Sequence, residues 1–307
     1  MGLQIEVIQL GRGEQQYQAL SFSQMLPWEP ILPEEIAELS LPEALDLSQG
    51  VVLYGKPTWV FGRLMVLCRE APWVGCYNGP AGGIVVVHSQ VASLEVGNLI
   101  PIQENASPCP AILIGGPPNS GKSVFSNALR SALVKAMPNC RTYLHRASWD
   151  GEGNWTYEAN SPMVKQFVVH NEFRIHENPE TAKLIPAYYQ HHAEAVENLR
   201  MMSDCVLVDV GGMPQPEKVP LIEQCTHYIV ISRLADAVED WHKRCGGVAA
   251  PLAVIHSVLE DKQEILQRKP FLEIVAGPWV ESGSVTFPEC VLESCVEVYE
   301  KRAKEKS

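Results

Sequence analysis

The first hundred residues alternate short apolar and polar patterns that are typical of a small mixed domain. Two segments alternate apolar and polar side chains, as half-buried strands do, and we expect them to pair antiparallel. Two continuous apolar runs predict buried strands, and apolar residues at helical spacing predict one helix between them. The paired strands are residues 5–10 and 17–22, the buried strands are residues 51–55 and 83–87, and the helix is residues 60–68. Residues 1–107 are therefore expected to form a small α+β domain, ferredoxin-like or related.

From residue 108 onward the pattern changes to apolar runs separated by helical stretches. Strands that alternate with helices imply a parallel sheet covered on both faces, so the fold class of the chain is α/β. A polar, proline-containing segment at residues 103–110 predicts the linker between the domains. The predicted strands are residues 111–115, 204–210, 227–232, 251–255 and 271–276, with a weaker one at 141–147.

A glycine-rich segment follows the first of these strands and precedes a helical stretch. Residues 116–123 fit G-x-x-x-x-G-K-[ST], the phosphate-binding P-loop, and residues 108–307 are thus expected to be a P-loop NTPase domain. Glycines let the loop amides point at phosphate, the lysine reaches the phosphates, and the serine hydroxyl contacts Mg²⁺. The expected ligands are ATP, with GTP left open, and Mg²⁺. The expected nucleotide-binding residues are Gly116, Asn119, Ser120, Gly121, Lys122, Ser123, Gly212 and Arg233.

The second part of a Mg²⁺ site is an acidic residue that ends a buried strand. The apolar run at residues 205–208 ends at Asp209, and a carboxylate at the carboxyl end of a parallel strand faces the ligand crevice. Ser123 and Asp209 are thus the expected metal residues. Asp209 to Gly212 also reads D-x-x-G, which places a glycine amide near the γ-phosphate. The alternative is that Asp209 caps a loop.

The segment between these motifs leaves the reaction open. Asp150 follows a predicted strand, and a carboxylate there could take a proton from a substrate hydroxyl, as in a small-molecule or nucleotide kinase. An Asp-Gly turn explains the same residues equally well. Arg146, Lys165 and Arg174 are candidate anion contacts or ordinary surface charges. Basic residues at 242–244 could form a lid or an arginine finger, or simply a solvated helix face.

Composition narrows the choice of partners. The net charge is −12, which argues against sequence-independent binding of DNA. Nine scattered cysteines, with no CxxC pair, predict reduced thiols and a cytoplasmic location. No apolar run approaches the length of a membrane span, so no membrane association is expected.

Four segments of the first domain carry a family resemblance. They are residues 50–59 (Gly-Val-Val-Leu-Tyr-Gly-Lys-Pro-Thr-Trp), 71–78 (Ala-Pro-Trp-Val-Gly-Cys-Tyr-Asn), 83–89 (Gly-Ile-Val-Val-Val-His-Ser) and 95–100 (Glu-Val-Gly-Asn-Leu-Ile). In this order they resemble the CRISPR-associated Csx-type ring nuclease family, over roughly residues 3–103. Some members of that family are similar to this chain throughout, with the small domain fused to a P-loop AAA-like ATPase domain.

The resemblance implies an ancillary protein of type III CRISPR antiviral defence. Such proteins bind and cleave the messenger cyclic tetra-adenylate, and Mn²⁺-dependent RNA deadenylation is also attributed to the family. The implied partners are ATP and cyclic tetra-adenylate or a related small RNA. The implied assembly is a homo-oligomer, built from dimers into a tetramer or filament. The cyclic-nucleotide-binding residues implied by the matching segments are Gly55, Trp59, Asn78, Gly79, His88 and Ser89.

This chain departs from the family where the chemistry is expected. Glu70 replaces a family histidine before the segment at residue 71, and Asn78-Gly79-Pro80 replaces Asp-Pro-Arg. Glu70 and His88 are the candidate catalytic substitutes in the first domain, beside Asp150 in the second. The leading hypothesis is a ring nuclease coupled to an ATP-binding domain. The alternatives are a kinase that uses Asp150 as base, and a non-catalytic, ATP-gated sensor or sponge of the messenger.

Overall fold

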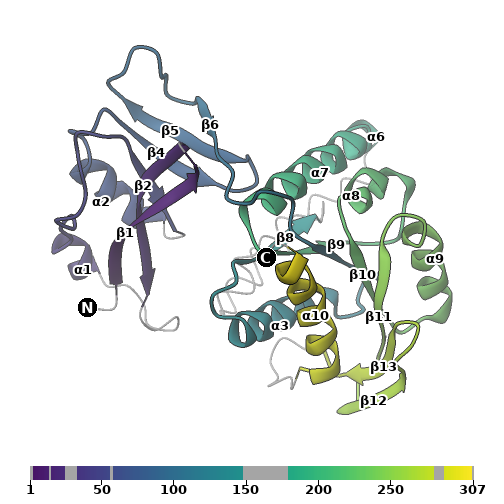
Figure 1. Ribbon diagram of the computed structural model, residues 1–307. Helices are drawn as coiled ribbons and strands as arrows, with labels where there is room; N and C mark the ends of the chain where they lie inside the picture. The colour runs from purple at the N-terminus through teal and green to yellow at the C-terminus, as the bar shows by residue number, and fades with distance from the viewer. Residues whose placement is uncertain are drawn as a thin grey trace. The chain divides into compact units, whose positions relative to one another are not determined.

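The chain folds as two units, Met1–Ala106 and Ser107–Ser307 (Figure 1). The computed structural model describes residues 3–13, 15–24, 33–55, 58–147, 179–279 and 287–305. Within these ranges, no helix has both the length and the apolar character needed to cross a membrane. The nine cysteines all lie in the described ranges, and none forms a disulfide.

The first unit is a six-stranded sheet in which the strands lie in chain order. A hairpin of two antiparallel strands is followed by two parallel pairings and then by two antiparallel ones. The elements are β1 (Leu3–Arg12), β2 (Gln15–Gln24), α1 (Pro33–Ala37), β3 (Val51–Tyr54), α2 (Thr58–Leu67), β4 (Trp73–Asn78), β5 (Gly83–Ser89) and β6 (Leu99–Pro101).

Helix α2 packs on this sheet through a buried apolar stripe. Val60, Leu64 and Cys68 are fully buried against strand residues such as Leu20 and Leu53. The predicted α+β class, the antiparallel pair and the helix are confirmed. The element order differs from the β-α-β-β-α-β order of a ferredoxin-like domain, because a tight turn rather than a crossover helix joins the first two strands.

The second unit is a seven-stranded sheet in the order β12-β13-β11-β10-β7-β9-β8. All pairings are parallel except that of β12 with β13. The six predicted strands are confirmed as β7 (Ala111–Gly115), β8 (Thr142–Ala147), β9 (Cys205–Val210), β10 (His227–Ser232), β11 (Ala250–Ser257) and β13 (Leu272–Gly277). Strand β12 (Lys262–Gln267) was not predicted, because its exposed edge position leaves it mostly polar.

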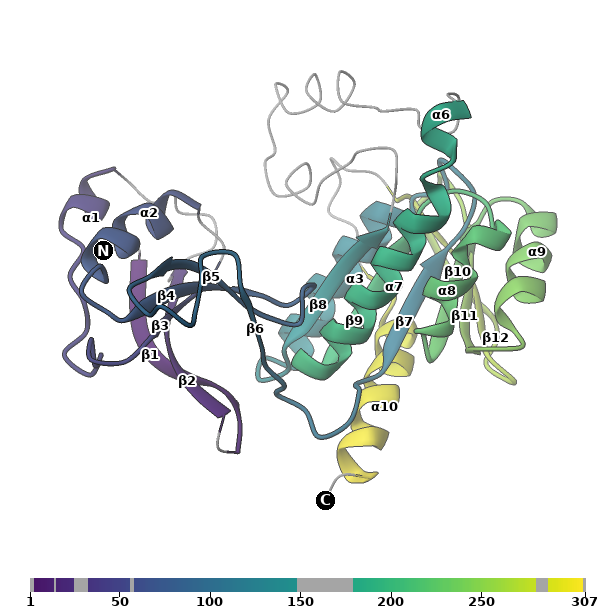
Figure 2. The same ribbon diagram turned by 90° about the horizontal axis from the view of Figure 1, so that it is seen from above.

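Helices cover both faces of this sheet (Figure 2). On one face α3 (Lys122–Ala136) and α10 (Glu289–Glu305) share a core with alternate residues of the central strands. On the other face lie α7 (Ile185–Met202), α8 (Val219–Glu223) and α9 (Ala235–Cys245). Two short elements complete the unit, α6 (Pro179–Ala182) and the 3₁₀ turn η2 (Pro216–Lys218). Burial on both faces explains why the central strands read as continuous apolar runs.

A neutral histidine pair fixes α7 to the outer strand β8. His145 Nε2 lies 2.7 Å from His192 Nδ1, so one ring donates a hydrogen bond to the other. Burial and the neighbouring histidines lower the pKa of His145 to about 3. Burial and the neighbouring His191 lower the pKa of His192 to about 4, so both rings are neutral at pH 7. Helix α7 is thus anchored through His192, one of its two adjacent histidines.

Replacing each of two glycines of the first unit by alanine should change its stability in opposite directions. A Cβ on Gly83 would lie 2.2 Å from the carbonyl oxygen of Ile100, so Gly83→Ala should destabilise the β5–β6 pairing by roughly 1–3 kcal/mol. A Cβ on Gly62 of α2 would meet nothing within 4 Å, so Gly62→Ala should stabilise the helix by roughly 0.5–1 kcal/mol. Hydrogen–deuterium exchange of β5, β6 and α2 in the full chain measures both. Equal exchange in the two variants would contradict this packing.

Candidate functional site

A glycine-rich loop connects β7 to α3 at the carboxyl end of the parallel strands. Gly116, Asn119 and Gly121 have φ of 152°, 57° and 84°, a region that side chains disfavour. A Cβ on Gly116 would lie 2.0 Å from the carbonyl oxygen of Ile231, and one on Gly121 would lie 2.5 Å from Trp279 Cβ. Both glycines of the motif are therefore required by the fold of the loop as well as by backbone geometry.

The loop ends at the amino terminus of the 15-residue helix α3. No acidic residue lies in its first turn, so the positive end of the helix dipole is not neutralised locally. The buried Lys122 donates a hydrogen bond from Nζ to the carbonyl oxygen of Pro117 at 2.8 Å. The buried Ser120 Oγ has no hydrogen-bond partner among the described residues. A cation, a helix terminus and an unsatisfied hydroxyl thus converge on one loop, which suits a phosphate group.

Three residues form a row across the neighbouring strands β8, β9 and β7. Asp209 is the register partner of Arg146 on β8 and of Ile114 on β7. Its side chain is 3% exposed, and that of Arg146 is 6% exposed. Arg146 Nε lies 3.4 Å from Asp209 Oδ2, and Arg146 Nη2 donates to Ser123 Oγ at 2.9 Å. Reading Arg146 as an ordinary surface charge is therefore wrong, because the strand register places it inside the crevice.

The residues expected to hold Mg²⁺ fit that ion chemically. Ser123 and Asp209 offer a hydroxyl and a carboxylate oxygen, the hard ligands that Mg²⁺ accepts beside substrate phosphates. Both already contact one cationic group, the guanidinium of Arg146, so their surroundings favour positive charge. Within the described ranges, no group of three or more His, Cys, Asp or Glu could hold a metal ion. A Mg²⁺ ion here would depend on the nucleotide for its remaining ligands, and no Mn²⁺ site is found in the first unit's described residues.

The loop after β9 is held by a buried lysine. Gly212 has φ of 72°, and the fully buried Lys218 donates from Nζ to the carbonyl oxygens of Gly211 and Met213. The ammonium also lies 5.7 Å from the ring centre of Tyr189 and 5.9 Å from that of Trp241. These two hydrogen bonds therefore hold the D-x-x-G segment in position. Sequence reasoning missed Lys218, because nothing near it in the chain distinguishes it from a surface lysine.

The other candidate cations of this unit differ in their positions. Arg233 follows β10, and its Nη2 donates to the carbonyl oxygen of Asn119 at 3.4 Å, so it touches the phosphate loop. Lys243 pairs with Glu239 on the exposed face of α9, and Arg244 donates to the carbonyl oxygen of Pro214. Lys243 fits the solvated-face interpretation of α9, whereas His242 and Arg244 are half-buried and contact Tyr228 and the loop after β9. Asp150, Lys165 and Arg174 lie outside the described residues.

The candidate residues of the first unit fall at two opposite ends of the β4–β5 hairpin. At one end Asn78 pairs with Gly83 and accepts a hydrogen bond from the amide of Ala81, and buried Gly79 follows in the turn. Gly55 lies at this same end, since β3 runs parallel to β4. Trp59 belongs to helix α2, but its side chain lies outside the described residues.

At the other end Ser89 pairs with Trp73, and His88 pairs with Val74. The Nε2 atom of His88 is buried and has no hydrogen-bond partner among the described residues. Glu70 is exposed and forms an ion pair with its neighbour Arg69 at 3.1 Å. At about 3.3 Å per strand residue, the two ends are roughly 17 Å apart, so one chain does not bring these candidates together.

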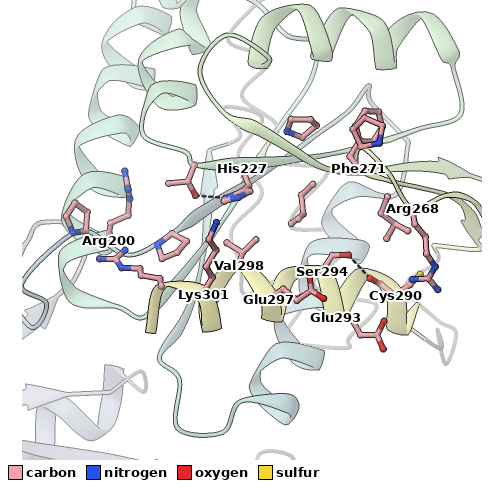
Figure 3. A pocket seen from close by; sticks show the side chains of 18 of the residues that line it. Arg200, His227, Arg268, Phe271, Cys290, Glu293, Ser294, Glu297, Val298 and Lys301 are labelled. Carbon is pink, nitrogen blue, oxygen red and sulfur yellow. Dashed lines mark hydrogen bonds between the residues drawn. The ribbon is translucent and has the colours of Figure 1, made fainter. Parts of the chain in front are cut away.

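A separate cleft of about 730 Å³ lies at the amino ends of the parallel strands, between the sheet and α10 (Figure 3). His227 is the first residue of β10, Thr226 precedes it, and Lys301 points toward His227 from α10. The positive charge of Lys301 adds to burial in lowering the pKa of His227. Arg200 and Arg302, also in its lining, bind the carbonyl oxygens of Cys109 and Ser107. This cleft is therefore distinct from the phosphate loop, which lies at the carboxyl ends of the same strands.

Comparison with known proteins finds a family for part of the first unit. Residues 25–101 match the family described as CRISPR-associated protein (Cas_csx3). No curated protein matches the chain. The match covers part of the first unit only, and the phosphate loop at residues 116–123 lies outside it.

Solved structures resemble the chain at low identity. One is a plasmid partition protein from Borrelia burgdorferi bound to AMPPNP, with 11% identity, a TM-score of 0.41, and coverage of 64% of this chain and 100% of that one. Another is the septum site-determining protein MinD from Pyrococcus horikoshii with Mg-ADP, with 12% identity, a TM-score of 0.37, and coverage of 65% and 98%. A third is a ParA family ATPase from Chlorobium tepidum, with 10% identity, a TM-score of 0.34, and coverage of 64% of this chain and 93% of that one.

Replacement of Lys218 tests how the loop after β9 is held. Lys218→Met keeps much of the side-chain volume but leaves the carbonyls of Gly211 and Met213 without their cationic donor. We expect a loss of roughly 2–3 kcal/mol in the free energy of unfolding and faster amide exchange at residues 211–213. Denaturant titration and hydrogen exchange measure the two effects. Lys243→Met, on the exposed face of α9, is the matched control and should change neither; wild-type behaviour of Lys218→Met would contradict the assigned anchor.

Proposed function

We propose that the second unit binds and hydrolyses Mg-ATP, and that the first unit binds and cuts cyclic tetra-adenylate or a related small RNA. The observation that carries the proposal is the loop at residues 116–123, which joins a motif for phosphate binding to a loop conformation that suits it. The setting we propose is type III CRISPR defence in the cytoplasm. The preference for ATP over GTP follows from the family resemblance of the first unit.

The phosphate loop supports nucleotide binding through its backbone and its lysine. The residues with positive φ turn the loop amides, and α3 adds its positive end. Lys122 would exchange the carbonyl of Pro117 for phosphate oxygens, because a charged acceptor forms the stronger hydrogen bond. Ser120 Oγ would gain the partner that it lacks among the described residues.

In hydrolysis a water molecule would attack the terminal phosphorus and ADP would leave, and the protein would promote this step by the placement of charge rather than by forming a covalent intermediate. Bound Mg²⁺, held through Ser123 and Asp209, would neutralise the charge that develops on the phosphate oxygens. The chain supplies Lys122 for the same charge and the amide of Gly212 as a donor toward the terminal phosphate. Lys218 keeps that amide in place by binding the carbonyls on either side of Gly212. Arg233 is positioned beside Asn119, where a further positive charge can reach the phosphates.

Binding of the messenger by the first unit is supported by the match of residues 25–101. Of the two catalytic candidates, His88 fits an acid–base role better than Glu70. Its buried Nε2 has no hydrogen-bond partner among the described residues, whereas Glu70 is exposed and paired with Arg69. An imidazole nitrogen that is buried and has no hydrogen-bond partner among the described residues is suited to contact a ligand directly.

A homo-oligomer would complete the first unit's site. The group around Gly55, Asn78 and Gly79 and the group around His88 and Ser89 lie at opposite ends of one hairpin, roughly 17 Å apart. A ligand that touches both groups would do so most simply between two copies of the chain, with one end contributed by each. A symmetric ligand made of repeated adenylates suits such a two-fold arrangement.

Removing the loop lysine tests the ATP proposal. We expect Lys122→Ala to weaken binding of a fluorescent ATP analogue by roughly 10- to 100-fold, because one charged contact to phosphate is lost. Lys135→Ala, at the exposed far end of the same helix, is the matched control and should bind as the wild type does. Phosphate release, measured alongside, should fall in Lys122→Ala only. Unchanged nucleotide affinity in Lys122→Ala would refute nucleotide binding at this loop.

Replacing His88 separates binding from cutting in the first unit. With labelled cyclic tetra-adenylate, we expect His88→Ala to slow cleavage by roughly 10²- to 10⁴-fold while changing affinity only a few-fold. Val87→Ala, the exposed neighbour on β5, is the control and should cleave normally. The assay is run with and without ATP. Full recovery of bound, intact messenger from the wild-type chain would overturn the cleavage part of the proposal, and absence of binding would overturn both parts.

A further inference from the structure

Arg146 contacts both of the residues expected to hold Mg²⁺, Ser123 and Asp209. Its Nη2 donates to Ser123 Oγ at 2.9 Å, and its Nε lies 3.4 Å from Asp209 Oδ2. These two nitrogens share one edge of the guanidinium, so a single planar group faces both oxygens. The register of β8 against β9 fixes this arrangement, since Arg146 and Asp209 are direct partners.

The charge of Asp209 explains why a cation must be present. Its side chain is 3% exposed and lies at the end of a strand that is buried along its whole length. A buried carboxylate requires a positive partner or several donors to remain ionised. Arg146 meets this need in the described structure, and Mg²⁺ bound with a nucleotide would meet the same need through the same oxygens.

We propose that Arg146 is a built-in counter-cation that competes with Mg²⁺ for Ser123 and Asp209. This inference rests on the proposed nucleotide function. In the nucleotide-free chain the guanidinium holds the two oxygens, and binding of Mg-nucleotide displaces it. The displaced group needs new acceptors, and the phosphate oxygens that arrive with Mg²⁺ are anionic acceptors suited to a guanidinium. Arg146 therefore raises the Mg²⁺ concentration at which the site loads, and couples loading to a movement at the end of β8.

The chain contains a matched control for this residue on the same two strands. Arg141 precedes β8 and pairs with Asp204, which precedes β9, through Nε and Nη2 at 3.0 and 3.1 Å. That ion pair resembles the Arg146–Asp209 pair, but it is about 40% exposed and lies at the opposite end of the strands from the phosphate loop. Arg141→Gln should therefore remove an arginine–aspartate pair without changing the response to Mg²⁺.

The experiment measures binding of fluorescent ADP, a readout independent of hydrolysis, as Mg²⁺ is titrated at fixed nucleotide. We expect Arg146→Gln and Arg146→Met to lower the Mg²⁺ concentration for half-maximal binding by about tenfold, because one charge-assisted competitor is lost. Arg141→Gln should match the wild type. Unchanged or weakened Mg²⁺ dependence in both Arg146 variants would overturn the inference, whereas failure of the wild type to bind ADP at all would overturn the proposed function instead.

A measurement on the wild-type chain covers the case in which the variants do not fold. With ¹⁵N-labelled arginine, the Nε resonance of Arg146 should shift when ADP and Mg²⁺ are added together, and should stay in place when ADP is added with a chelator. The resonance of Arg141 is the internal reference and should not move. A fixed Arg146 resonance under saturating Mg-ADP would show that the guanidinium stays on Asp209, contrary to the inference.

Discussion

The nucleotide unit depends on one buried carboxylate and on the cation that balances it. Asp209 ends a strand flanked on both sides, by β7 and β8, so water cannot stabilise its charge. The strand that carries the phosphate loop and the strand that carries Asp209 are direct neighbours, which places Ser123 and the carboxylate around the same cation. Any ligand that enters the crevice must preserve this balance of charge.

A second buried charge that needs partners lies next to the loop that follows Asp209. Lys218 is a fully buried cation, and it contacts two carbonyl oxygens and two aromatic rings. The two buried charges thus lie at either end of one short segment and fix it from both sides. Contacts at both of its ends hold this segment in position and can thereby fix the amide of Gly212.

Much of this organisation could be predicted from the sequence. Continuous apolar runs identify β7, β9 and β10, because strands buried on both faces cannot alternate, and the loop motif locates the phosphate site. Strand β12 could not be predicted from its sequence, because an exposed antiparallel edge strand needs few apolar residues. The position of Arg146 depends on the register between β8 and β9, and the position of Lys218 depends on tertiary packing. Neither can be predicted from the neighbouring residues in the sequence. The separation of Asn78 from His88 likewise follows from hairpin pairing and not from their spacing in the chain.

The glycines that shape the phosphate loop also place it between two indole rings. A Cβ on Gly115 would lie 2.8 Å from Trp241 Cε3, and one on Gly121 would touch Trp279, so both rings contact the loop backbone at its two ends. Trp241 is fully buried and Trp279 nearly so, and the second donates a hydrogen bond to the carbonyl of Ala276. The loop consequently carries two intrinsic fluorophores whose emission depends on the local field and packing. We therefore expect the fluorescence of these two tryptophans to respond to occupancy of the crevice, without any attached label.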